Sequence, residues 1–228
     1  MVESREQRSV APQEETMKWH LEVLRPAQQR LLGEAGMMLD RAGFYLAGGT
    51  AVALHIGHRR SIDLDWFSGE SLGDVMRMAK ALSEDIGFHT SEVAPGTLHG
   101  TASGVRLSFM EYRYPLLRRL ASIGRFGCRV ASLRDLACMK LSAAAQRGSK
   151  KDFVDIYALL TEHGTLAAML DSYVRKYRVS DVSHVLYGLA YFEDAEKERM
   201  PAMLWNVTWK EVKDTVRGAV KEAARDLS

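Results

Sequence analysis

The sequence predicts an α+β fold in which a half containing strands precedes a half built of helices. Short apolar runs bounded by glycines, a pattern typical of buried strands, recur as far as residue 131. Beyond that residue, apolar side chains recur only at the three- and four-residue spacing of helices. We therefore expect a flexible N-terminus over residues 1–16, an α/β domain over 17–131 and a helical domain over 132–228.

A long helix and a short strand open the first half. Apolar residues at helical spacing predict a helix over residues 17–42, which Pro26 either starts or kinks. The apolar run 44–47 is too short for a helix and predicts a buried strand. The other elements expected here are a helix over 72–87, strands over 88–93, 104–110 and 127–131, a glycine-rich connection over 95–100 and a proline-bearing loop over 112–120.

A glycine turn follows the first predicted strand. It consists of Gly48, Gly49 and Thr50, and we expect Thr50 to be the N-cap of a short helix over residues 51–56. Free backbone N–H groups at a turn that opens a helix are suited to phosphate oxygens. The Thr50 hydroxyl is therefore expected to cap the helix, to hydrogen bond a phosphate, or to do both.

Two aspartates lie on the strand expected over residues 61–67. Asp63 and Asp65 are two residues apart, so their carboxylates project from one face of the strand. They are either the solvated face of an edge strand or, as we favour because the glycine turn precedes them, ligands of a hard cation that relieves their mutual repulsion. The alternate residues are expected to point into the core: Ile62, Leu64 and Trp66. The turn and the pair together indicate a site that holds a nucleoside triphosphate through Mg²⁺.

Capping signals mark the helices of the second half. Ser132 with Asp135 three residues later forms a capping-box-like start for a helix over 132–146. Gly148 ends it, and a second helix is expected over 151–163. Two further helical stretches, 186–192 and 209–223, complete this half.

Composition and charge indicate a soluble globular protein. Of the 228 residues, 46% are hydrophobic and 26% charged, and the formal net charge of +2 demands no nucleic-acid partner. No run approaches the roughly 18 apolar residues of a membrane helix, and the first residues lack the apolar stretch of a signal peptide. Because the two cysteines form no CxxC pair, a reducing compartment is favoured. We expect a cytoplasmic protein without membrane contact.

The string YLAGGTAVALHIGHRRSIDLDWFS resembles the signature of the AbiEii/AbiGii-type nucleotidyltransferases, toxins of bacterial abortive-infection and toxin–antitoxin systems. VRLSFMEYRYPLL is similar to the middle strand of that family, VASLRDLACMKLSAAAQRGSKKDFVDIYALL to its helical signature and LAYFEDAEKERMPAMLW to its C-terminal part. The resemblance covers residues 20 to 215. It implies a polymerase-β-like nucleotidyltransferase domain with a small mixed sheet, followed by a helical domain. It also implies nucleotide transfer from an NTP to an acceptor hydroxyl, with a cognate antitoxin as partner.

In that family the glycine turn, here Gly48, Gly49 and Thr50, contacts the triphosphate, and the DxD acids, here Asp63 and Asp65, bind metal. The cofactor implied is Mg²⁺ in a two-ion site, in which one ion activates the attacking hydroxyl and the other steadies the leaving pyrophosphate.

A lysine and an aspartate of the helical half complete the site in the family. Lys140 interrupts an apolar helix and is either a surface lysine or, as we favour, a partner of triphosphate oxygens. Arg147, two turns further along the same face, extends this positive strip. Asp152 and Asp155 share a helix face, and either one orients Lys140 or takes the proton of the acceptor. We prefer Asp152 for the catalytic role and Asp155 for supporting hydrogen bonds.

The sequence departs from the full pattern where a third carboxylate is expected. In VRLSFME, Ser108 occupies the position at which alternation would place that acid, and Glu111 lies on the wrong face. The departure weakens metal affinity. It motivates an alternative, a catalytically inactive nucleotide-binding protein of the same fold. A phosphatase with an aspartyl nucleophile is less favoured, because Trp66 and Phe67 stand where such enzymes place a threonine or serine.

Several basic residues and histidines accompany the predicted site. His55 and His58 are spaced like zinc ligands, but Gly57 interrupts the helix, so a structural or substrate-contacting role is favoured; Arg59 or Arg60 faces phosphate or acceptor RNA. The acceptor is either a tRNA 3′ end or a protein hydroxyl. A second group of arginines offers an RNA-backbone contact: Arg113, Arg118, Arg119 and Arg125.

Overall fold

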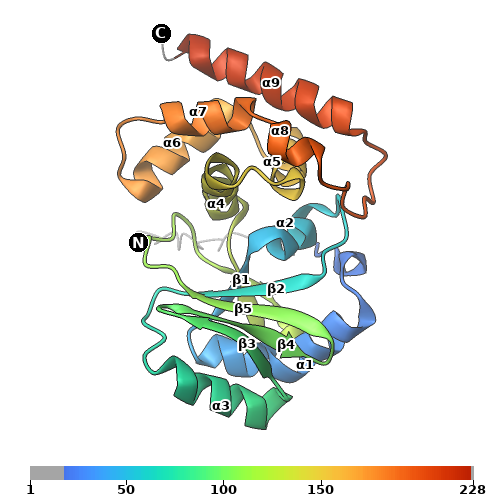
Figure 1. The fold of residues 1–228 in the computed structure, drawn as a ribbon, viewed down its shortest axis with the longest axis vertical. Helices are drawn as coiled ribbons and strands as arrows, with labels where there is room; N and C mark the ends of the chain where they lie inside the picture. Colours follow the sequence, from blue (N-terminus) through green and yellow to red (C-terminus); the bar gives the residue numbers. More distant parts are fainter. Residues whose placement is uncertain (1–17, 227–228) are drawn as a thin grey trace, which may run out of the picture.

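The computed structural model describes residues 18–226, and the flexible N-terminus predicted for residues 1–16 lies outside them. A sheet-containing part and a helical part lie one above the other in Figure 1. The strands are β1 (Tyr45–Ala47), β2 (Asp63–Ser68), β3 (His89–Ala94), β4 (Thr97–Ala102), β5 (Val105–Glu111), β6 (Ala121–Ile123) and β7 (Cys128–Val130). The helices are α1 (Pro26–Arg41), α2 (Gly48–Ile56), α3 (Val75–Ile86), α4 (Leu133–Gln146), α5 (Lys150–Glu162), α6 (Leu166–Tyr177), α7 (Ser183–Ala190), α8 (Glu193–Glu196) and α9 (Trp209–Asp226), with 3₁₀ turns at Leu21–Val23 and Gly124–Phe126.

The strands form one mixed sheet in the order β3-β4-β5-β2-β1-β7-β6. β2 pairs in parallel with β5, and β1 with β7, whereas the other neighbours are antiparallel. The predicted α+β class, a mixed sheet followed by helices, is confirmed. β2 lies inside the sheet, between β1 and β5, so the acidic pair does not belong to an edge strand.

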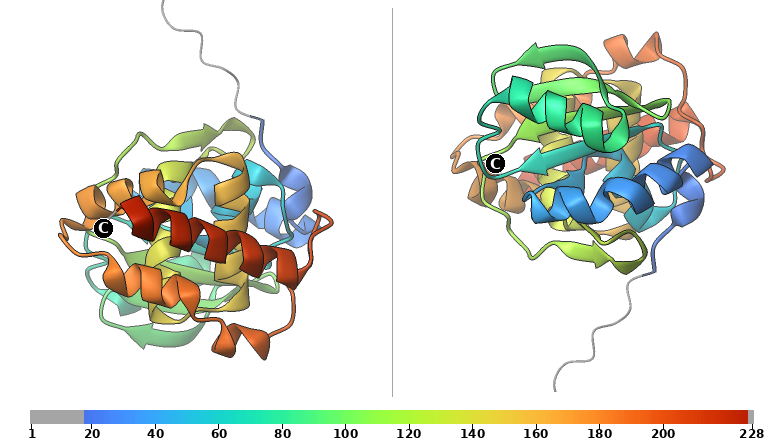
Figure 2. Two further views of the ribbon diagram at one scale, coloured as in Figure 1. Left: turned by 90° about the horizontal axis from the view of Figure 1, so that it is seen from above. Right: turned by 90° about the horizontal axis from the view of Figure 1, so that it is seen from below.

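Helices cover both faces of the sheet. α1 and α3 pack on one face, and α2 lies between the other face and the helical half (Figures 1 and 2). The N-cap of α3 is Asp74, whose carboxylate accepts two backbone N–H bonds, and its C-cap is Gly87 in the left-handed conformation. The largest fully buried side chains include Trp66, Phe88 and Phe109.

α4 is the central helix of the second half and contacts α2, α5, α6 and α7. The Ser132 hydroxyl accepts the Asp135 N–H at 3.1 Å, so the predicted cap is confirmed. α7 approaches α4 closely because Gly188 has no side chain; a Cβ there would lie 2.6 Å from the Cα of Ala145. α9 crosses the far end of this half (Figure 2). The chain passes from β7 to α4 at residues 131–132, and the division into two domains stays a prediction.

The structure corrects the expected pattern of strands. The connection expected over 95–100 is wrong, because most of it belongs to β4, which pairs with both β3 and β5. Gly100 is required there for packing, since a Cβ would collide with the Phe88 ring and the His89 carbonyl. β6 is an additional short strand that the sequence pattern did not indicate.

Three local expectations are also corrected or settled. Pro26 occupies the first position of α1, so it starts the helix and does not kink it. Ile62 does not join the core, because its side chain is 45% exposed, whereas Leu64 and Trp66 are buried as predicted. Thr50 is not an N-cap: α2 begins at Gly48, and Thr50 lies within its first turn.

Among the described helices, none combines the length and the apolar composition that a bilayer span requires.

Candidate active site

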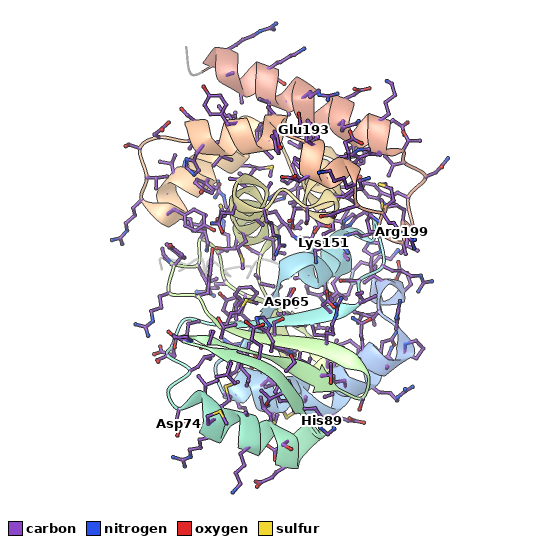
Figure 3. The ribbon with its side chains drawn as sticks, viewed as in Figure 1. Asp65, Asp74, His89, Lys151, Glu193 and Arg199 are labelled. Atoms are coloured by element: carbon purple, nitrogen blue, oxygen red, sulfur yellow. The ribbon has the colours of Figure 1, made fainter. Side chains whose placement is uncertain are left out.

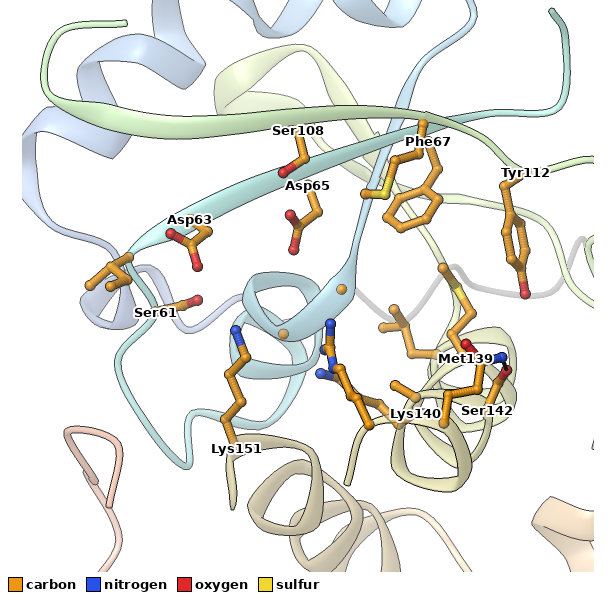
Figure 4. Close-up of a pocket in the computed structure, with 18 of the residues that line it drawn as sticks. Ser61, Asp63, Asp65, Phe67, Ser108, Tyr112, Met139, Lys140, Ser142 and Lys151 are labelled. Atoms are coloured by element: carbon orange, nitrogen blue, oxygen red, sulfur yellow. Dashed lines mark hydrogen bonds between the residues drawn. The ribbon is translucent and has the colours of Figure 1, made fainter. Parts of the chain in front are cut away.

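A cavity of about 750 Å³ lies between the sheet and the helical half. In Figure 3, Asp65 marks its sheet side and Lys151 its helical side, and Figure 4 shows the residues around it. The predicted site residues that line it are Gly48, Gly49, Asp63, Asp65, Ser108, Lys140 and Arg147. Thr50 and Asp152 are buried and are not among the lining residues. The size is that of a small-molecule site.

β2 brings the acidic pair to the cavity. Asp63 and Asp65 project from the same face of the strand, as Figure 4 shows. Burial raises the pKa of Asp65 above its ordinary value; Lys140 opposes this shift, and the charge of Asp63 adds to it. Asp63 has a partner in Arg106, whose Nε lies 2.7 Å from Asp63 Oδ1. The ionised Asp65 is therefore only partly compensated by the protein.

β5 supplies the neighbours of this pair. In the parallel register Arg106 lies beside Asp63 and Ser108 beside Asp65. The Ser108 side chain lies next to Asp65 and lowers its pKa, and it stands where a third acid was expected. Glu111 is turned away and accepts the Leu72 N–H at 2.9 Å.

The donor set suits a hard divalent cation. Two carboxylates and one hydroxyl project into the same region, from Asp63, Asp65 and Ser108. Hard cations such as Mg²⁺ take oxygen ligands and often need only one or two protein carboxylates when a phosphate supplies the rest. Within residues 18–226, no three His, Cys, Asp or Glu side chains converge on a point. A cation here would therefore need phosphate oxygens in addition to the protein ligands.

The two glycines keep the start of α2 against the acids. Gly48 has a positive φ of 67°, and a Cβ there would collide with the Asp65 carboxylate. A Cβ at Gly49 would collide with the Arg59 guanidinium. Gly48 therefore requires glycine, whereas at Gly49 a side chain would force the Arg59 guanidinium to shift. The nine-residue α2 begins in the cavity lining with Gly48 and Gly49, and at this end the helix dipole favours negative charge.

Thr50 connects α2 to β2 and does not reach the cavity. It is buried, its hydroxyl donates to the main-chain oxygen of Asp63, and it lies 2.6 Å from the Ser61 hydroxyl. These bonds fix the strand that carries the acids. The predicted N-cap is thus replaced by a bond to the neighbouring strand.

Asp155, on α5, is the centre of a buried ionic cluster. Its carboxylate accepts Arg59 Nε at 2.6 Å and Nη2 at 2.9 Å, His58 Nε2 at 2.8 Å, and has Lys140 Nζ at 2.7 Å. Burial alone would raise the pKa of Asp155, but Arg59, Lys140 and His58 outweigh it and hold the pKa well below the ordinary range. Asp155 thereby presents Arg59 and Lys140 to the cavity, the supporting role predicted for it.

Asp152, one turn earlier, is a second such anchor. It accepts Lys140 Nζ at 3.0 Å, Arg147 Nε at 2.8 Å and the Ser149 hydroxyl at 2.6 Å. Burial opposes ionisation of Asp152, but Lys140 and Arg147 prevail and its pKa is lowered. A buried carboxylate with occupied oxygens and a low pKa is a weak proton acceptor. Of the two alternatives for Asp152, the arrangement favours orienting Lys140 over taking a proton.

Lys151 is a cavity residue that the sequence reasoning missed. It is exposed, lines the cavity, and points from α5 toward the sheet side that holds Asp63 (Figure 4). A signal was present, because a lysine in the first turn of a helix opposes the helix dipole and needs another reason to be there.

An aromatic wall, also not predicted, closes the other end of the cavity. The Tyr112 and Tyr177 hydroxyls are 2.6 Å apart, and the wall consists of Phe67, Tyr112, Tyr114, Tyr173 and Tyr177. Such rings offer flat apolar faces to a planar group.

The histidines have structural partners. His55 Nε2 lies 2.9 Å from the Ala131 carbonyl oxygen, and burial lowers the pKa of His55 to about 4. His58 is buried against Asp155. These contacts favour the structural role over zinc binding. Arg59 and Arg60 both line the cavity, and Arg60 also donates to the Glu22 carbonyl at 3.2 Å.

Comparisons with known proteins find one matching family and several similar proteins. A sequence model of the family described as "Nucleotidyl transferase AbiEii toxin, Type IV TA system" matches residues 110–226. An uncharacterized protein of Aquifex aeolicus is 39% identical over 181 residues, which cover 78% of this chain and 87% of that protein. Similar solved structures include JHP933 from Helicobacter pylori (16% identity, TM-score 0.49, 91% of this chain and 93% of the other). Another is the nucleotidyltransferase toxin MenT4 from Mycobacterium tuberculosis (14%, 0.49, 86% and 82%).

Proposed function

The chain belongs to the AbiEii family of nucleotidyltransferase toxins, and we propose that it transfers a nucleotide from an NTP to an acceptor hydroxyl with the help of Mg²⁺. One observation carries the proposal: a single cavity brings the carboxylates of Asp63 and Asp65 opposite an excess of cationic side chains. This combination suits a metal-bound triphosphate, in which the carboxylates hold the metal and the cations bind phosphate oxygens.

The charges across the cavity from β2 match a polyphosphate. Four cations and two carboxylates lie on that side: Arg59, Lys140, Arg147, Lys151, Asp152 and Asp155. Arg59, Lys140 and Arg147 are held in place by the two buried aspartates, so their geometry is fixed before a ligand arrives, whereas the exposed Lys151 is not anchored. The N–H groups that open α2 add donors for phosphate oxygens.

Asp63 and Asp65 are the residues that would hold the metal, with the Ser108 hydroxyl beside Asp65. When bound, Mg²⁺ in a two-ion site neutralises the triphosphate, activates the attacking hydroxyl and stabilises the leaving pyrophosphate. The supporting observation is the raised pKa of Asp65, caused first by burial and increased by Asp63, which a neighbouring cation would reverse.

The chain's own residues position the reactants. Lys140 and Arg147, fixed by Asp152, bind and orient the triphosphate, and Lys151 reaches it from the solvent side. We assign Asp152 a positioning role for these cations. The aromatic wall around Tyr112 receives the planar base or the acceptor and excludes water from that end.

The acceptor is a tRNA 3′ end or a protein hydroxyl, and the proposal includes a cognate antitoxin because the family is described as belonging to toxin–antitoxin systems. A second candidate function follows from Ser108, which replaces an expected third acid. A site with fewer carboxylates binds metal less tightly, so the chain would then bind NTP without transferring it.

Labelling distinguishes the two functions. Each NTP, labelled at the α-phosphate, is incubated with Mg²⁺, bacterial RNA and bacterial protein, and with the wild type or Asp65→Asn. Asp85→Asn is the matched control, because Asp85 is exposed on α3 across the sheet. Label in one fraction that depends on Mg²⁺ and disappears only with Asp65→Asn supports transfer and identifies the acceptor class. Absence of label, while NTP still raises the melting temperature, supports the binding protein.

A further inference from the structure

A second cavity, of about 460 Å³, lies beside β6 and the starts of α4 and α6. Its charged or titratable lining residues are all basic: His55, Arg118, Arg119, Arg134 and His163. No carboxylate belongs to the lining that the structure describes. Nothing in the nucleotide site requires this concentration of positive charge.

The loop between β5 and β6 is anchored so that its arginines face this cavity. The Asp135 carboxylate accepts the N–H groups of Leu117 at 2.9 Å and Arg118 at 3.2 Å. Asp135 is fully buried and also binds Lys176 Nζ at 2.7 Å. The Asp135 carboxylate is therefore already paired with Lys176. The exposed guanidinium groups of Arg118 and Arg119 have no carboxylate partner among the described residues.

The arginines named from the sequence separate into two pairs. Arg113 has a carboxylate partner, Glu111 Oε2 at 2.9 Å, and Arg125 lies over the Phe126 ring at 5.7 Å. In the described part of the chain, the side chains of Arg118 and Arg119 have neither kind of partner. Unpaired arginines converging on a concave site favour a ligand with phosphate oxygens, to which guanidinium binds in a bidentate manner.

One further arginine adds positive charge to this cavity, and a histidine lies beside it. Arg134 donates Nε to the Ser172 hydroxyl at 2.9 Å, which leaves the rest of its guanidinium for a ligand. Burial, and to a smaller extent Arg134, lower the pKa of His163, so its imidazole does not add to the charge of the arginines at neutral pH. Among the described residues, this lining includes no Phe, Tyr or Trp, the ring types that form the wall of the first cavity.

The two cavities share the elements that line them. Leu136, Met139 and Lys140 of α4 face the first cavity, whereas Leu133 and Arg134 face the second. α6 and the loop between β5 and β6 are divided in the same way. A helix is about 10 Å across, so a ligand in one cavity lies within a few nucleotides' length of the other.

We propose that the second cavity binds backbone phosphates of an RNA strand whose end lies in the first cavity. Guanidinium contacts to phosphate oxygens match backbone recognition, which positions a strand without reading its sequence. The inference rests on the proposed function only in taking the RNA to be the acceptor. Phosphate binding at the arginines does not require that the first cavity transfers nucleotides.

Binding of a labelled single-stranded RNA, followed by fluorescence anisotropy over a series of salt concentrations, tests the site. The test variant is Arg118→Gln/Arg119→Gln, and the control is Arg113→Gln/Arg125→Gln, which removes the same charge from the same region. We expect the test variant alone to weaken binding about tenfold or more, and to reduce the slope of log affinity against log salt by about 0.7 for each lost contact. Equal losses in both variants would overturn the site, since only net charge would then matter.

Two further measurements separate the possible failures. Melting curves with NTP examine the first cavity: if the test variant keeps the NTP-induced rise and binds RNA like the wild type, the second site is refuted while the proposed function stands. If RNA binding depends on the two arginines but no NTP raises the melting temperature, the second site is supported and the proposed function is not. Inorganic phosphate that stabilises the wild type through these arginines as strongly as RNA of equal phosphate content would assign the cavity to a small ligand and overturn the RNA proposal.

Discussion

Aspartates on the two sides of the first cavity have opposite electrostatics. On β2, burial raises the pKa of Asp65, and the protein supplies only partial compensation. On α5, Asp152 and Asp155 are fully buried, yet neighbouring cations lower the pKa of both. The same residue type is thus an anchor for cations on one side and a carrier of uncompensated charge on the other. Only the β2 side has the property expected of ligands for an external cation.

Removal of an α5 anchor should have the largest effect on stability. Asp155→Ala leaves Arg59, Lys140 and His58 without their shared partner, and an unpaired buried charge costs about 3–5 kcal/mol. Urea unfolding at neutral pH measures the loss. Asp85→Asn, which removes an exposed carboxylate, is the control and should change the free energy of unfolding by less than about 0.5 kcal/mol. A loss below about 1 kcal/mol for Asp155→Ala would show that the cluster is not an anchor.

Adding a side chain at the start of α2 should have the next largest effect on stability, because it would collide with Asp65 on β2. Gly48→Ala forces a Cβ against the Asp65 carboxylate at a residue with positive φ, which costs about 1–3 kcal/mol. Gly33→Ala on α1 is the matched control, because a Cβ at that position meets no atom within 4 Å. Thermal unfolding of both variants compares them. Similar melting temperatures would mean that Asp65 and α2 separate without cost.

On the helical side of the cavity, removal of the unanchored cation Lys151 should weaken ligand binding without changing stability. Lys151 is exposed and lines the cavity, so Lys151→Gln should leave the free energy of unfolding unchanged and weaken NTP binding about tenfold, or ~1.4 kcal/mol. Calorimetric titration with NTP and Mg²⁺ measures the affinity. Lys221→Gln on α9 provides a control with the same charge change. Equal affinities of the Lys151 variant and the wild type would remove Lys151 from the site.

The site residues on the sheet side could be predicted from the sequence, because their arrangement follows from the alternation of side chains along a strand. Alternation along a strand placed Asp63 and Asp65 on one face and Ser108 at the level of the pair. The β4 strand was missed because Gly100 weakens a strand pattern, and its reason, the nearby Phe88 ring, becomes visible only after folding. The same limit applies to Thr50, whose bond to the β2 backbone depends on tertiary contact and replaces the expected cap.

The arrangement on the helical side could not be predicted from the sequence, because it depends on contacts between residues far apart in the chain. Arg59 and Asp155 are 96 positions apart in the chain, and no spacing rule connects them. Lys140 and Asp152 were identified by family resemblance, but which of the possible roles Asp152 has depends on how many donors reach its carboxylate. The second cavity likewise depends on the anchoring of one loop by Asp135, which sequence reasoning had identified only as part of a helix cap.

The smallest expected effect belongs to Asp65→Asn, which tests the comparison most directly. It should raise the free energy of unfolding, whereas Asp155→Ala on α5 should lower it. A folded-state pKa above the unfolded value means that the folded protein binds the extra proton, so the contribution of Asp65 to stability falls as pH rises from 3.8 through its folded pKa. Asp65→Asn removes this cost and should increase the free energy of unfolding at neutral pH by less than about 1 kcal/mol.

Urea unfolding from acidic to neutral pH, without Mg²⁺, should show this gain only above the pKa of the wild-type carboxyl. Adding Mg²⁺ with NTP should stabilise the wild type and not the variant, which reverses their order. A variant less stable than the wild type at neutral pH in the absence of Mg²⁺ would mean that Asp65 is already compensated within the protein. It would then resemble the α5 aspartates, and the distinction between the two sides of the cavity would be lost.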